Sequence, residues 1–404
     1  MTKIHRFFIL SGFLLFSSFL FSQQIAAQKP YLILVSFDGF RHDYPSLTNT
    51  PNFKFIETNG FKAEALKPAF PSQTFPNHYS MVTGLYPEHH GIVGNTFFAP
   101  DINKSFKVGS VDASENPDFY LGEPIWKTVM RYNKKSAVYF WVGSEAIKPN
   151  YFYKYDSKVP YDARIEQLNR WLELPYSERP NLICLYFEEV DWQGHDYGAK
   201  STEVLQAVRV ADALLGRIIT TIHESDLADS INLVVASDHG MIDMIPENAI
   251  DIEPILKKLP ANATVSPYYS TTSVYIPGIS VDSLIAEFPN IPHLSVYNTK
   301  KAPLTLHINE TNRLGDIILI PEPGYKLKRG EKPYSLSKAG HGFDPENSDM
   351  WGIFYAYGPS VKRNTKGPVA DVVDVYPFCL SLLGLSIDHK TDGTAEHLKS
   401  ALKK

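Results

Sequence analysis

The sequence is poor in cysteine and carries no large excess of charge of either sign. Only 2 of its 404 residues are cysteine, which excludes a scaffold stapled by several disulfides and a zinc site built from thiolates. The 39 basic and 44 acidic side chains give a formal charge of −5, which argues against electrostatic binding of nucleic acids. Any metal ion must therefore be held by carboxylates and by the imidazoles of the 13 histidines.

Glycine and proline are not in excess either. Their 24 and 29 residues are ordinary usage, which excludes collagen-like and linker-rich architectures. Hydrophobic residues make up 44% of the chain and charged residues 21%, which is typical of a protein with a large globular core. The two cysteines, Cys184 and Cys379, lie in apolar segments, so we expect two buried free thiols, with a disulfide as the alternative.

The first 27 residues have the pattern of a secretory signal peptide. Lys3 and Arg6 precede an apolar run from Phe7 to Phe21, and small and polar residues follow it. A membrane anchor is the alternative, but this run falls short of the roughly 20 residues that span a bilayer. We therefore predict export to the periplasm or secretion, a mature chain that begins near Gln28, and no transmembrane segment after the signal is removed.

Three segments have the pattern of short strands buried on both faces. They are residues 31–37 (YLILVSF), 181–187 (NLICLYF) and 231–236 (INLVVA), and each is a continuous apolar run. Helical spacing of apolar residues lies between them, for example over 161–172 and 202–222. Such alternation predicts an α/β fold with an open, mostly parallel sheet.

A stretch from about residue 246 to 340 breaks this alternation. It is rich in Pro, Tyr, Asn and Ser and contains short alternating pieces such as 272–276 and 316–320, so we predict a smaller α+β insertion. The main sheet resumes at 351–357, and 370–383 is predicted to be a closing helix. Residues 28–404 would then form one domain that includes this insertion.

Acidic residues follow each of the three predicted strands. Asp38 follows the first strand, residues 188–191 (EEVD) follow the second, and Asp238 follows the third. Ligands of open parallel sheets bind beyond the carboxyl ends of the strands. Three carboxylates at one edge would repel one another unless a cation lay among them.

Three short motifs add imidazoles to these carboxylates. Asp191 and His195 are four residues apart, which on a helix places both on one face, and a surface turn is the alternative. His239 directly follows Asp238, and His341 lies between two glycines that allow close approach of backbone, although a flexible loop is the alternative there. Six N/O ligands without sulfur suit a pair of Zn²⁺ ions, which favours phosphoryl transfer; the six are Asp38, Asp191, His195, Asp238, His239 and His341.

Thr74 is the candidate nucleophile. It lies in the segment 67–79 (KPAFPSQTFPNHY), where prolines restrict the backbone and a helix begins nearby. A hydroxyl at a helix N-terminus that is bound to zinc can lose its proton near neutral pH and attack phosphorus. The alternative is an ordinary helix cap.

Five blocks of sequence together resemble the nucleotide pyrophosphatase/phosphodiesterase family of the alkaline phosphatase superfamily. In chain order they read VSFDGFRHDY, PAFPSQTFPNHYSMVTGLYPEHHGIVGN, DWQGH, SDHGM and GHGFDP, and they cover nearly all of the mature chain. The resemblance implies an alkaline-phosphatase-like sandwich, with a central mostly parallel sheet flanked by helices and a smaller α+β insertion. It also implies that the chain holds the catalytic domain alone.

The resemblance assigns roles to individual residues. It makes Thr74 the nucleophile, next to one zinc held by Asp38, Asp238 and His239. It assigns the other zinc to Asp191, His195 and His341. It matches Asn95 with a family asparagine that donates a hydrogen bond to a phosphoryl oxygen, as transition-state charge requires.

Two features bear on the substrate. Relatives that hydrolyse monoesters carry a Lys-x-Arg motif where this chain has residues 141–145 (WVGSE), so we favour diesters. Family members selective for nucleotides stack the base between two rings, for which Phe75 and Tyr155 are the best matches and Tyr153 the next. The alternative is that these rings only pack in the core or at its rim.

Taken together, the sequence predicts an enzyme that uses two Zn²⁺ ions to hydrolyse nucleotide 5′-phosphodiester and pyrophosphate bonds. A phosphothreonine intermediate would release nucleoside 5′-monophosphate. We expect a monomer that binds small-molecule nucleotides and no specific nucleic-acid sequence. The alternatives are a choline or lysophospholipid phosphodiesterase at the same site, or an inactive binding protein of the same fold.

Overall fold

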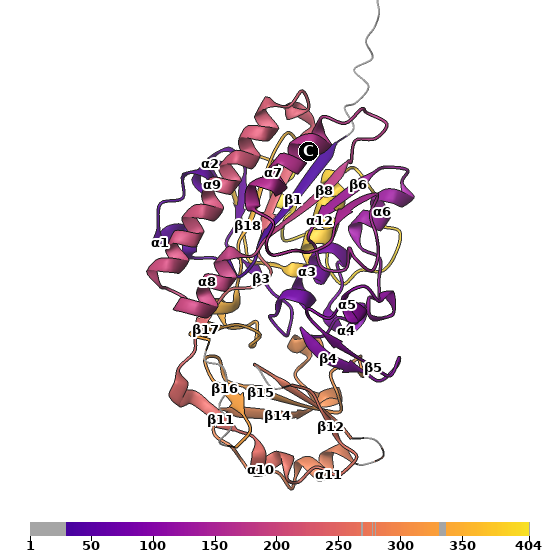
Figure 1. The fold of residues 1–404 in the computed structure, drawn as a ribbon, viewed down its shortest axis with the longest axis vertical. Helices are drawn as coiled ribbons and strands as arrows, with labels where there is room; N and C mark the ends of the chain where they lie inside the picture. Colours follow the sequence, from indigo (N-terminus) through magenta and orange to yellow (C-terminus); the bar gives the residue numbers. More distant parts are fainter. Residues whose placement is uncertain (1–29, 268–269, 277, 279, 331–336, 404) are drawn as a thin grey trace, which may run out of the picture.

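The computed structural model describes residues 30–403, except 268–269, 277, 279 and 331–336 (Figure 1). The predicted signal peptide at residues 1–27 lies outside the described residues. A large lobe is built on an eight-stranded sheet, above a smaller lobe in Figure 1. The strand order of the large sheet is β19 (Thr365–Gly367), β2 (Phe61–Ala63), β18 (Phe354–Tyr357), β9 (Ile231–Ala236), β1 (Tyr31–Phe37), β8 (Leu182–Phe187), β6 (Ser136–Tyr139) and β7 (Tyr151–Tyr153).

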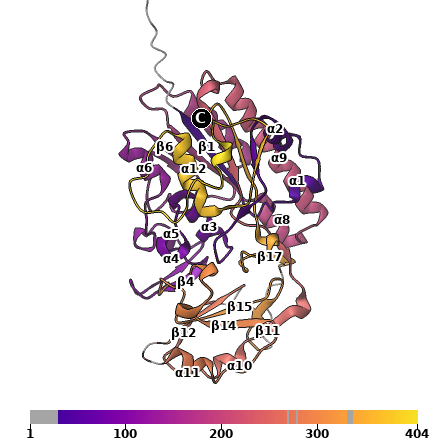
Figure 2. The same ribbon diagram turned by 180° about the vertical axis from the view of Figure 1, so that it is seen from behind.

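Helices cover both faces of this sheet (Figures 1 and 2). Alternate residues of β1 point to opposite sides: Leu32 and Leu34 belong to one apolar cluster, whereas Ile33 and Val35 belong to the other. The first cluster includes side chains of α3 (Thr74–Thr83), α6 (Ile125–Arg131) and α12 (Val375–Leu382). The second includes side chains of α2 (Pro51–Asn59), α7 (Tyr161–Leu172) and α9 (Thr202–Glu224). The lobe is therefore a three-layer α/β/α sandwich.

The large sheet is mostly parallel, as predicted. β1 pairs in parallel with both β8 and β9, whereas β18 runs antiparallel to its neighbours β2 and β9. The predicted strands at 31–37 and 231–236 have the bounds of β1 and β9, and the strand predicted from residue 181 begins one residue later. Because β8, β1 and β9 are adjacent, the acidic residues that follow them emerge side by side.

The predicted closing helix at 370–383 is only partly helical. Residues Ala370–Asp371 form the short strand β20, which pairs with β3 (Leu66–Lys67), and a 3₁₀ turn at Val372–Asp374 precedes α12. The side chains of Asp371 and Asp374 form a reciprocal capping box at that turn. This local pairing delays the start of the α-helix to Val375.

The smaller lobe holds a four-stranded antiparallel sheet. Its elements lie between residues 249 and 328 and have their own apolar core, which includes Ile250, Val274 and Leu319. In order across the sheet, its strands are β12 (Thr264–Val265), β13 (Thr272–Tyr275), β15 (Ile317–Pro321) and β14 (Leu294–Asn298). A separate parallel pair consists of β11 (Ala249–Asp251) and β16 (Lys326–Lys328). Two short helices, α10 (Glu253–Leu256) and α11 (Val281–Ile285), lie at the end of this lobe that is farthest from the large lobe (Figure 1).

Short elements connect these layers. They are α1 (Tyr44–Leu47), α4 (Pro87–His90), α5 (Val111–Ser114) and α8 (Glu189–Tyr197), the strand pairs β4 (Thr96–Ala99) with β5 (Lys104–Lys107) and β10 (Ile242–Asp243) with β17 (Ala339–Gly340), and 3₁₀ turns at 117–119, 228–230, 246–248, 299–301, 304–306, 348–350, 372–374 and 399–401. Both cysteines are buried free thiols, as predicted. Within the described ranges, no helix has the length and apolarity needed to cross a bilayer.

Arg313 anchors the chain of the smaller lobe to the large lobe. Its side chain is 2% exposed, donates hydrogen bonds to the backbone carbonyls of Gly91 and Phe119 at 3.0 and 2.6 Å, and pairs with Asp101 at 2.5 Å.

We expect Arg313→Met to lower the free energy of unfolding by about 3 kcal/mol, because the carbonyls and the carboxylate lose their donor. Urea denaturation measures this loss, and the exposed Arg363→Met is the control, expected to change stability by less than about 0.5 kcal/mol. Equal losses in both variants would contradict the anchoring role.

Candidate active site

The carboxyl ends of β8, β1 and β9 bring carboxylates and imidazoles together. Asp38 follows β1, Asp238 follows β9, and Asp191 lies on α8, which begins directly after β8. Asp38 and Asp238 are each 1% exposed and Asp191 is 7% exposed. The chain topology thus gathers buried negative charge at one edge of the sheet, where ligands of such folds bind.

The first predicted ligand group is compact. Asp38, Asp238 and His239 offer ligand atoms that all lie within 4.8 Å of one another. The Nε2 atom of His239 lies 3.4 Å from Asp38 Oδ1 and 3.1 Å from Asp238 Oδ2. These N/O donors, with no sulfur among them, match the ligands that Zn²⁺ and similar divalent ions accept in proteins.

The second predicted group, Asp191, His195 and His341, is continuous with the first. The Nε2 atoms of His195 and His341 lie 3.2 Å apart, and Asp191 carboxylate oxygens lie 3.5 and 3.7 Å from these two nitrogens. His239 also approaches this group, because its ring stacks on that of His341 with centroids 3.7 Å apart. A close triad of possible ligands therefore also forms from Asp191, His239 and His341. The structure brings all six residues together, with His239 between the two groups.

The carboxylates of this cluster fit a bound cation. One oxygen atom of each of Asp38, Asp191 and Asp238 is buried and has no hydrogen-bond partner among the described residues. Buried polar atoms are normally satisfied, so three unsatisfied carboxylate oxygens at one place need an external partner. A divalent cation satisfies such oxygens and offsets the repulsion between their charges.

The titration of the cluster reflects the same crowding. Burial raises the pKa of Asp38 well above its ordinary value, and the negative charge of Asp238 raises it further. Burial also raises the pKa of Asp191. Burial also acts to raise the pKa of Asp238, but the charges of His239, His78 and His341 and a hydrogen bond with His78 together outweigh it, so this pKa lies below the ordinary value. Burial and the charge of His239 hold the pKa of His341 well below its ordinary value, which keeps that imidazole neutral and able to ligate a metal.

Thr74 lies at the N-terminus of α3, next to this cluster. Its Oγ1 atom is 3.3 Å from His239 Nε2. The Asn77 side chain holds the preceding loop in place, since its Oδ1 accepts a hydrogen bond from the Ala69 amide at 2.7 Å and its Nδ2 donates to the Gln73 carbonyl at 2.9 Å. The helix dipole favours negative charge at this position, so the arrangement stabilises an ionised hydroxyl.

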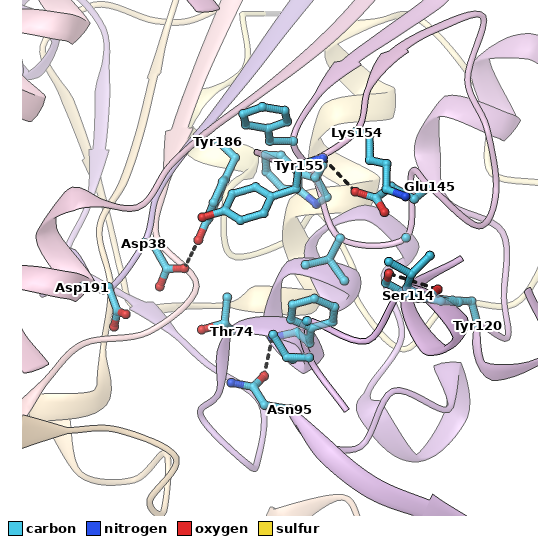
Figure 3. Close-up of a pocket in the computed structure, with 18 of the residues that line it drawn as sticks. Asp38, Thr74, Asn95, Ser114, Tyr120, Glu145, Lys154, Tyr155, Tyr186 and Asp191 are labelled. Atoms are coloured by element: carbon cyan, nitrogen blue, oxygen red, sulfur yellow. Dashed lines mark hydrogen bonds between the residues drawn. The ribbon is translucent and has the colours of Figure 1, made fainter. Parts of the chain in front are cut away.

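Asn95 lies beside Thr74, and two hydrogen bonds determine its orientation. Its Oδ1 accepts a hydrogen bond from the Phe75 amide at 3.0 Å, and its own backbone amide donates to Gln73 Oε1 at 2.8 Å. With Oδ1 engaged, the Nδ2 amino group is turned away from that bond and is available to donate to an oxyanion (Figure 3).

A cavity of about 410 Å³ opens next to Thr74 (Figure 3). Phe75 and Tyr155, the two rings predicted to stack on a base, both line it. Tyr153 is not among the lining residues: its ring stacks on Tyr139 with centroids 4.4 Å apart, and its hydroxyl donates to Gln167. The structure thus brings Phe75 and Tyr155 to the candidate site and leaves Tyr153 outside it.

Two further residues contact the carboxylates and were not predicted. Tyr186 donates a hydrogen bond from its hydroxyl to Asp38 Oδ2 at 2.6 Å. His78 is buried, with Nδ1 3.2 Å from Asp238 Oδ2 and Nε2 2.8 Å from Ser36 Oγ. His78 is four residues after Thr74 and so lies on the same face of α3, which is a signal that the sequence contains. Tyr186 carries no such signal, because it lies within an apolar strand.

Comparisons with known proteins identify relatives of this chain. The family model "Type I phosphodiesterase / nucleotide pyrophosphatase" matches residues 32–344. The bovine ectonucleotide pyrophosphatase/phosphodiesterase family member 3 is 34% identical over 390 residues, which are 91% of this chain and 44% of that protein. Venom phosphodiesterase 2 of Crotalus adamanteus is 32% identical over 392 residues, 92% of this chain and 47% of that protein. The chain therefore spans less than half the length of these relatives.

Solved structures show the same fold. Murine ectonucleotide pyrophosphatase/phosphodiesterase 5, in an inactive threonine-to-alanine variant in complex with AMP, has a TM-score of 0.85 and 28% identity, and the match covers 93% of this chain and 100% of that chain. The human protein of the same name gives the same TM-score, identity and coverage. The predicted alkaline-phosphatase-like α/β fold is confirmed, and the chain belongs to the type I phosphodiesterase/nucleotide pyrophosphatase family.

Proposed function

We propose that this chain hydrolyses nucleotide 5′-phosphodiester and pyrophosphate bonds and releases nucleoside 5′-monophosphate, with Thr74 as the nucleophile. The observation that carries the proposal is the position of Thr74 Oγ1, 3.3 Å from His239 Nε2, at the side of an aromatic cavity. The murine structural relative supports it, because its threonine-to-alanine variant is inactive and binds AMP. Export of the chain is part of the proposal, since its relatives include ectoenzymes and venom enzymes.

Two Zn²⁺ ions are the proposed cofactors, in line with the metal dependence of the family. Asp38, Asp238 and His239 would hold one ion, and Asp191, His195 and His341 the other. When bound, such a pair supplies Lewis-acid stabilisation of the attacking and departing oxygens. We propose that residues 28–404 form the catalytic domain and that about 246–340 are an insertion within it.

The residues of this chain then perform two displacements. Thr74 Oγ attacks phosphorus, and the bond between phosphorus and the leaving oxygen breaks, which gives a phosphothreonyl nucleotide. Water next attacks the same phosphorus, the bond to Thr74 Oγ breaks, and nucleoside 5′-monophosphate departs. Asn95 Nδ2 donates to a non-bridging phosphoryl oxygen during both steps, where negative charge accumulates.

The cavity beside Thr74 favours a nucleoside as the retained half of the substrate. Phe75 and Tyr155 both line it, and stacking on one aromatic ring is worth about 1–3 kcal/mol per base. Glu145 also lines this cavity, and rings with a carboxylate are what a quaternary ammonium group binds. A comparison of nucleotide and choline esters therefore discriminates between a nucleotide phosphodiesterase and a choline phosphodiesterase.

We expect the chain to hydrolyse p-nitrophenyl-TMP far faster than p-nitrophenyl phosphorylcholine. Tyr155→Ala is expected to lower kcat/KM for the nucleotide ester by about 5- to 100-fold, because one stacking ring is lost. The matched control is Tyr153→Ala, which removes a ring outside the cavity and is expected to change kcat/KM less than about 2-fold. Faster cleavage of the choline ester, or equal losses in both variants, would overturn the assignment of this cavity to a nucleoside.

A further inference from the structure

A second cavity lies beside the segment that holds Thr74, with Gln73 in its wall. Its volume is about 470 Å³, and Asn95 lines both cavities. His195 and His341 of the predicted metal cluster also line it. Its far wall comes from the smaller lobe, which contributes Ser270 and Lys326. The second cavity is therefore formed between the catalytic cluster and the smaller lobe.

The two cavities differ in charge. The first is lined by Asp38, Glu145 and Asp191, and its lysine, Lys154, is paired with Glu115. The described residues that line the second cavity include Lys107 and Lys326 and no carboxylate. Two ammonium groups, with no carboxylate among the lining residues that the structure describes, attract an anion and disfavour a quaternary ammonium group.

Both lysines are suited to an anionic ligand. Lys107 lies at the end of β5, its side chain is exposed, and none of the described carboxylates lies within ion-pair distance of its ammonium group. Lys326 begins β16 and is partly buried, and an anion beside a partly buried ammonium group is attracted more strongly than one beside a fully solvated ammonium group. Polar groups extend the wall, since Gln73 Nε2 lies 3.5 Å from Ser270 Oγ.

The chemistry of displacement at phosphorus relates this cavity to the leaving group. Attacking and departing oxygens lie roughly in line on opposite sides of phosphorus. Thr74 Oγ1 attacks from the side of His239, with the first cavity next to it. The departing group then leaves on the side of His195 and His341, which is the side of the second cavity.

We propose that Lys107 and Lys326 are specificity-determining residues that bind a phosphorylated leaving group in the second cavity. The pyrophosphate portion of a nucleoside triphosphate and the distal phosphates of a dinucleoside polyphosphate share this chemistry. The smaller lobe would thus select pyrophosphate bonds over diesters with a neutral leaving group. This inference rests on the proposed function and deepens it.

The test compares two substrates that share the thymidine half, TTP and p-nitrophenyl-TMP, in the full chain loaded with zinc. Lys107→Met and Lys326→Met keep most of the side-chain length and remove the charge. Each is expected to lower kcat/KM for TTP by about 10-fold and the double variant by about 100-fold, as for lost charge-assisted hydrogen bonds. For p-nitrophenyl-TMP, kcat/KM is expected to change less than about 2-fold.

One further measurement and one control variant complete the test. Inorganic pyrophosphate, assayed as an inhibitor of p-nitrophenyl-TMP hydrolysis at fixed zinc, is expected to inhibit the double variant about 10-fold more weakly than the unaltered chain. Lys104→Met is the matched control, because Lys104 lies on the same strand, is 3.5 Å from Asp118 and does not line the cavity.

The outcomes separate the two proposals. Equal losses on both substrates, or no loss on TTP, would overturn the role of the lysines while leaving the proposed function intact. An unaltered chain that cleaves neither substrate would overturn the proposed function itself. A selective loss on TTP with weaker inhibition by pyrophosphate supports the inference, and Lys326→Arg is then expected to retain most activity on TTP.

Discussion

Replacing Thr74 with alanine is expected to lower kcat for p-nitrophenyl-TMP by at least about 10³-fold, as for removal of a covalent nucleophile. The change deletes Oγ1, the atom that lies 3.3 Å from His239 Nε2, and leaves the six acidic and imidazole side chains in place. Alanine is also well tolerated in the first turn of a helix, so α3 should keep its start. Steady-state assays of kcat test the expected loss of turnover. Elemental analysis of bound zinc tests the expected retention of the metal.

Two variants control for this result. Thr74→Ser keeps a hydroxyl and is expected to retain measurable turnover. Thr83→Ala removes a threonine hydroxyl from the same helix, where it donates to the Tyr79 carbonyl at 2.7 Å, and is expected to leave kcat within about 2-fold. Normal turnover by Thr74→Ala would show that Thr74 is not the nucleophile.

The central sheet could be predicted because buried parallel strands have a strong local signal. The runs at β1 and β9 are apolar at nearly every position and end at polar residues, so their bounds follow from composition alone. The convergence of Asp38 and Asp238 follows in turn, because parallel neighbours end at the same edge. The short strands β6 and β7, at one end of the sheet, have no comparable signal.

The parts of the site that could not be predicted depend on contacts between distant segments. Tyr153 and Tyr155 look equivalent in sequence, yet the parallel pairing of β7 with β6 places Tyr153 on Tyr139, outside the first cavity. Lys326 lies more than two hundred residues from Thr74 in the chain, and only the packing of the smaller lobe brings it to the same site. The position of His239 between the two ligand groups likewise depends on tertiary structure, since adjacent residues at a strand end can point in several directions.

Removal of divalent cations is expected to have an effect as large as loss of Thr74. Three buried carboxylates, those of Asp38, Asp191 and Asp238, each keep one oxygen without a hydrogen-bond partner among the described residues. Without a cation these charges repel one another in a site shielded from solvent, and the phosphoryl group loses its Lewis acid. Several kcal/mol of lost transition-state stabilisation corresponds to a decrease in kcat of about 10³-fold or more.

Dialysis against a zinc chelator is therefore expected to abolish turnover of p-nitrophenyl-TMP and to lower Tm by at least about 5 °C, because a cation that binds only the folded chain stabilises it. Added Zn²⁺ should restore both turnover and Tm.

His239→Ala removes the imidazole that contacts both ligand groups, so this variant is expected to lose activity and most of the zinc-dependent rise in Tm. His223→Ala is the matched control, since His223 lies on α9 and bonds to the Tyr357 hydroxyl at 2.9 Å, away from the cluster. A chelated chain with unchanged turnover and Tm would show that the cluster acts without a metal ion.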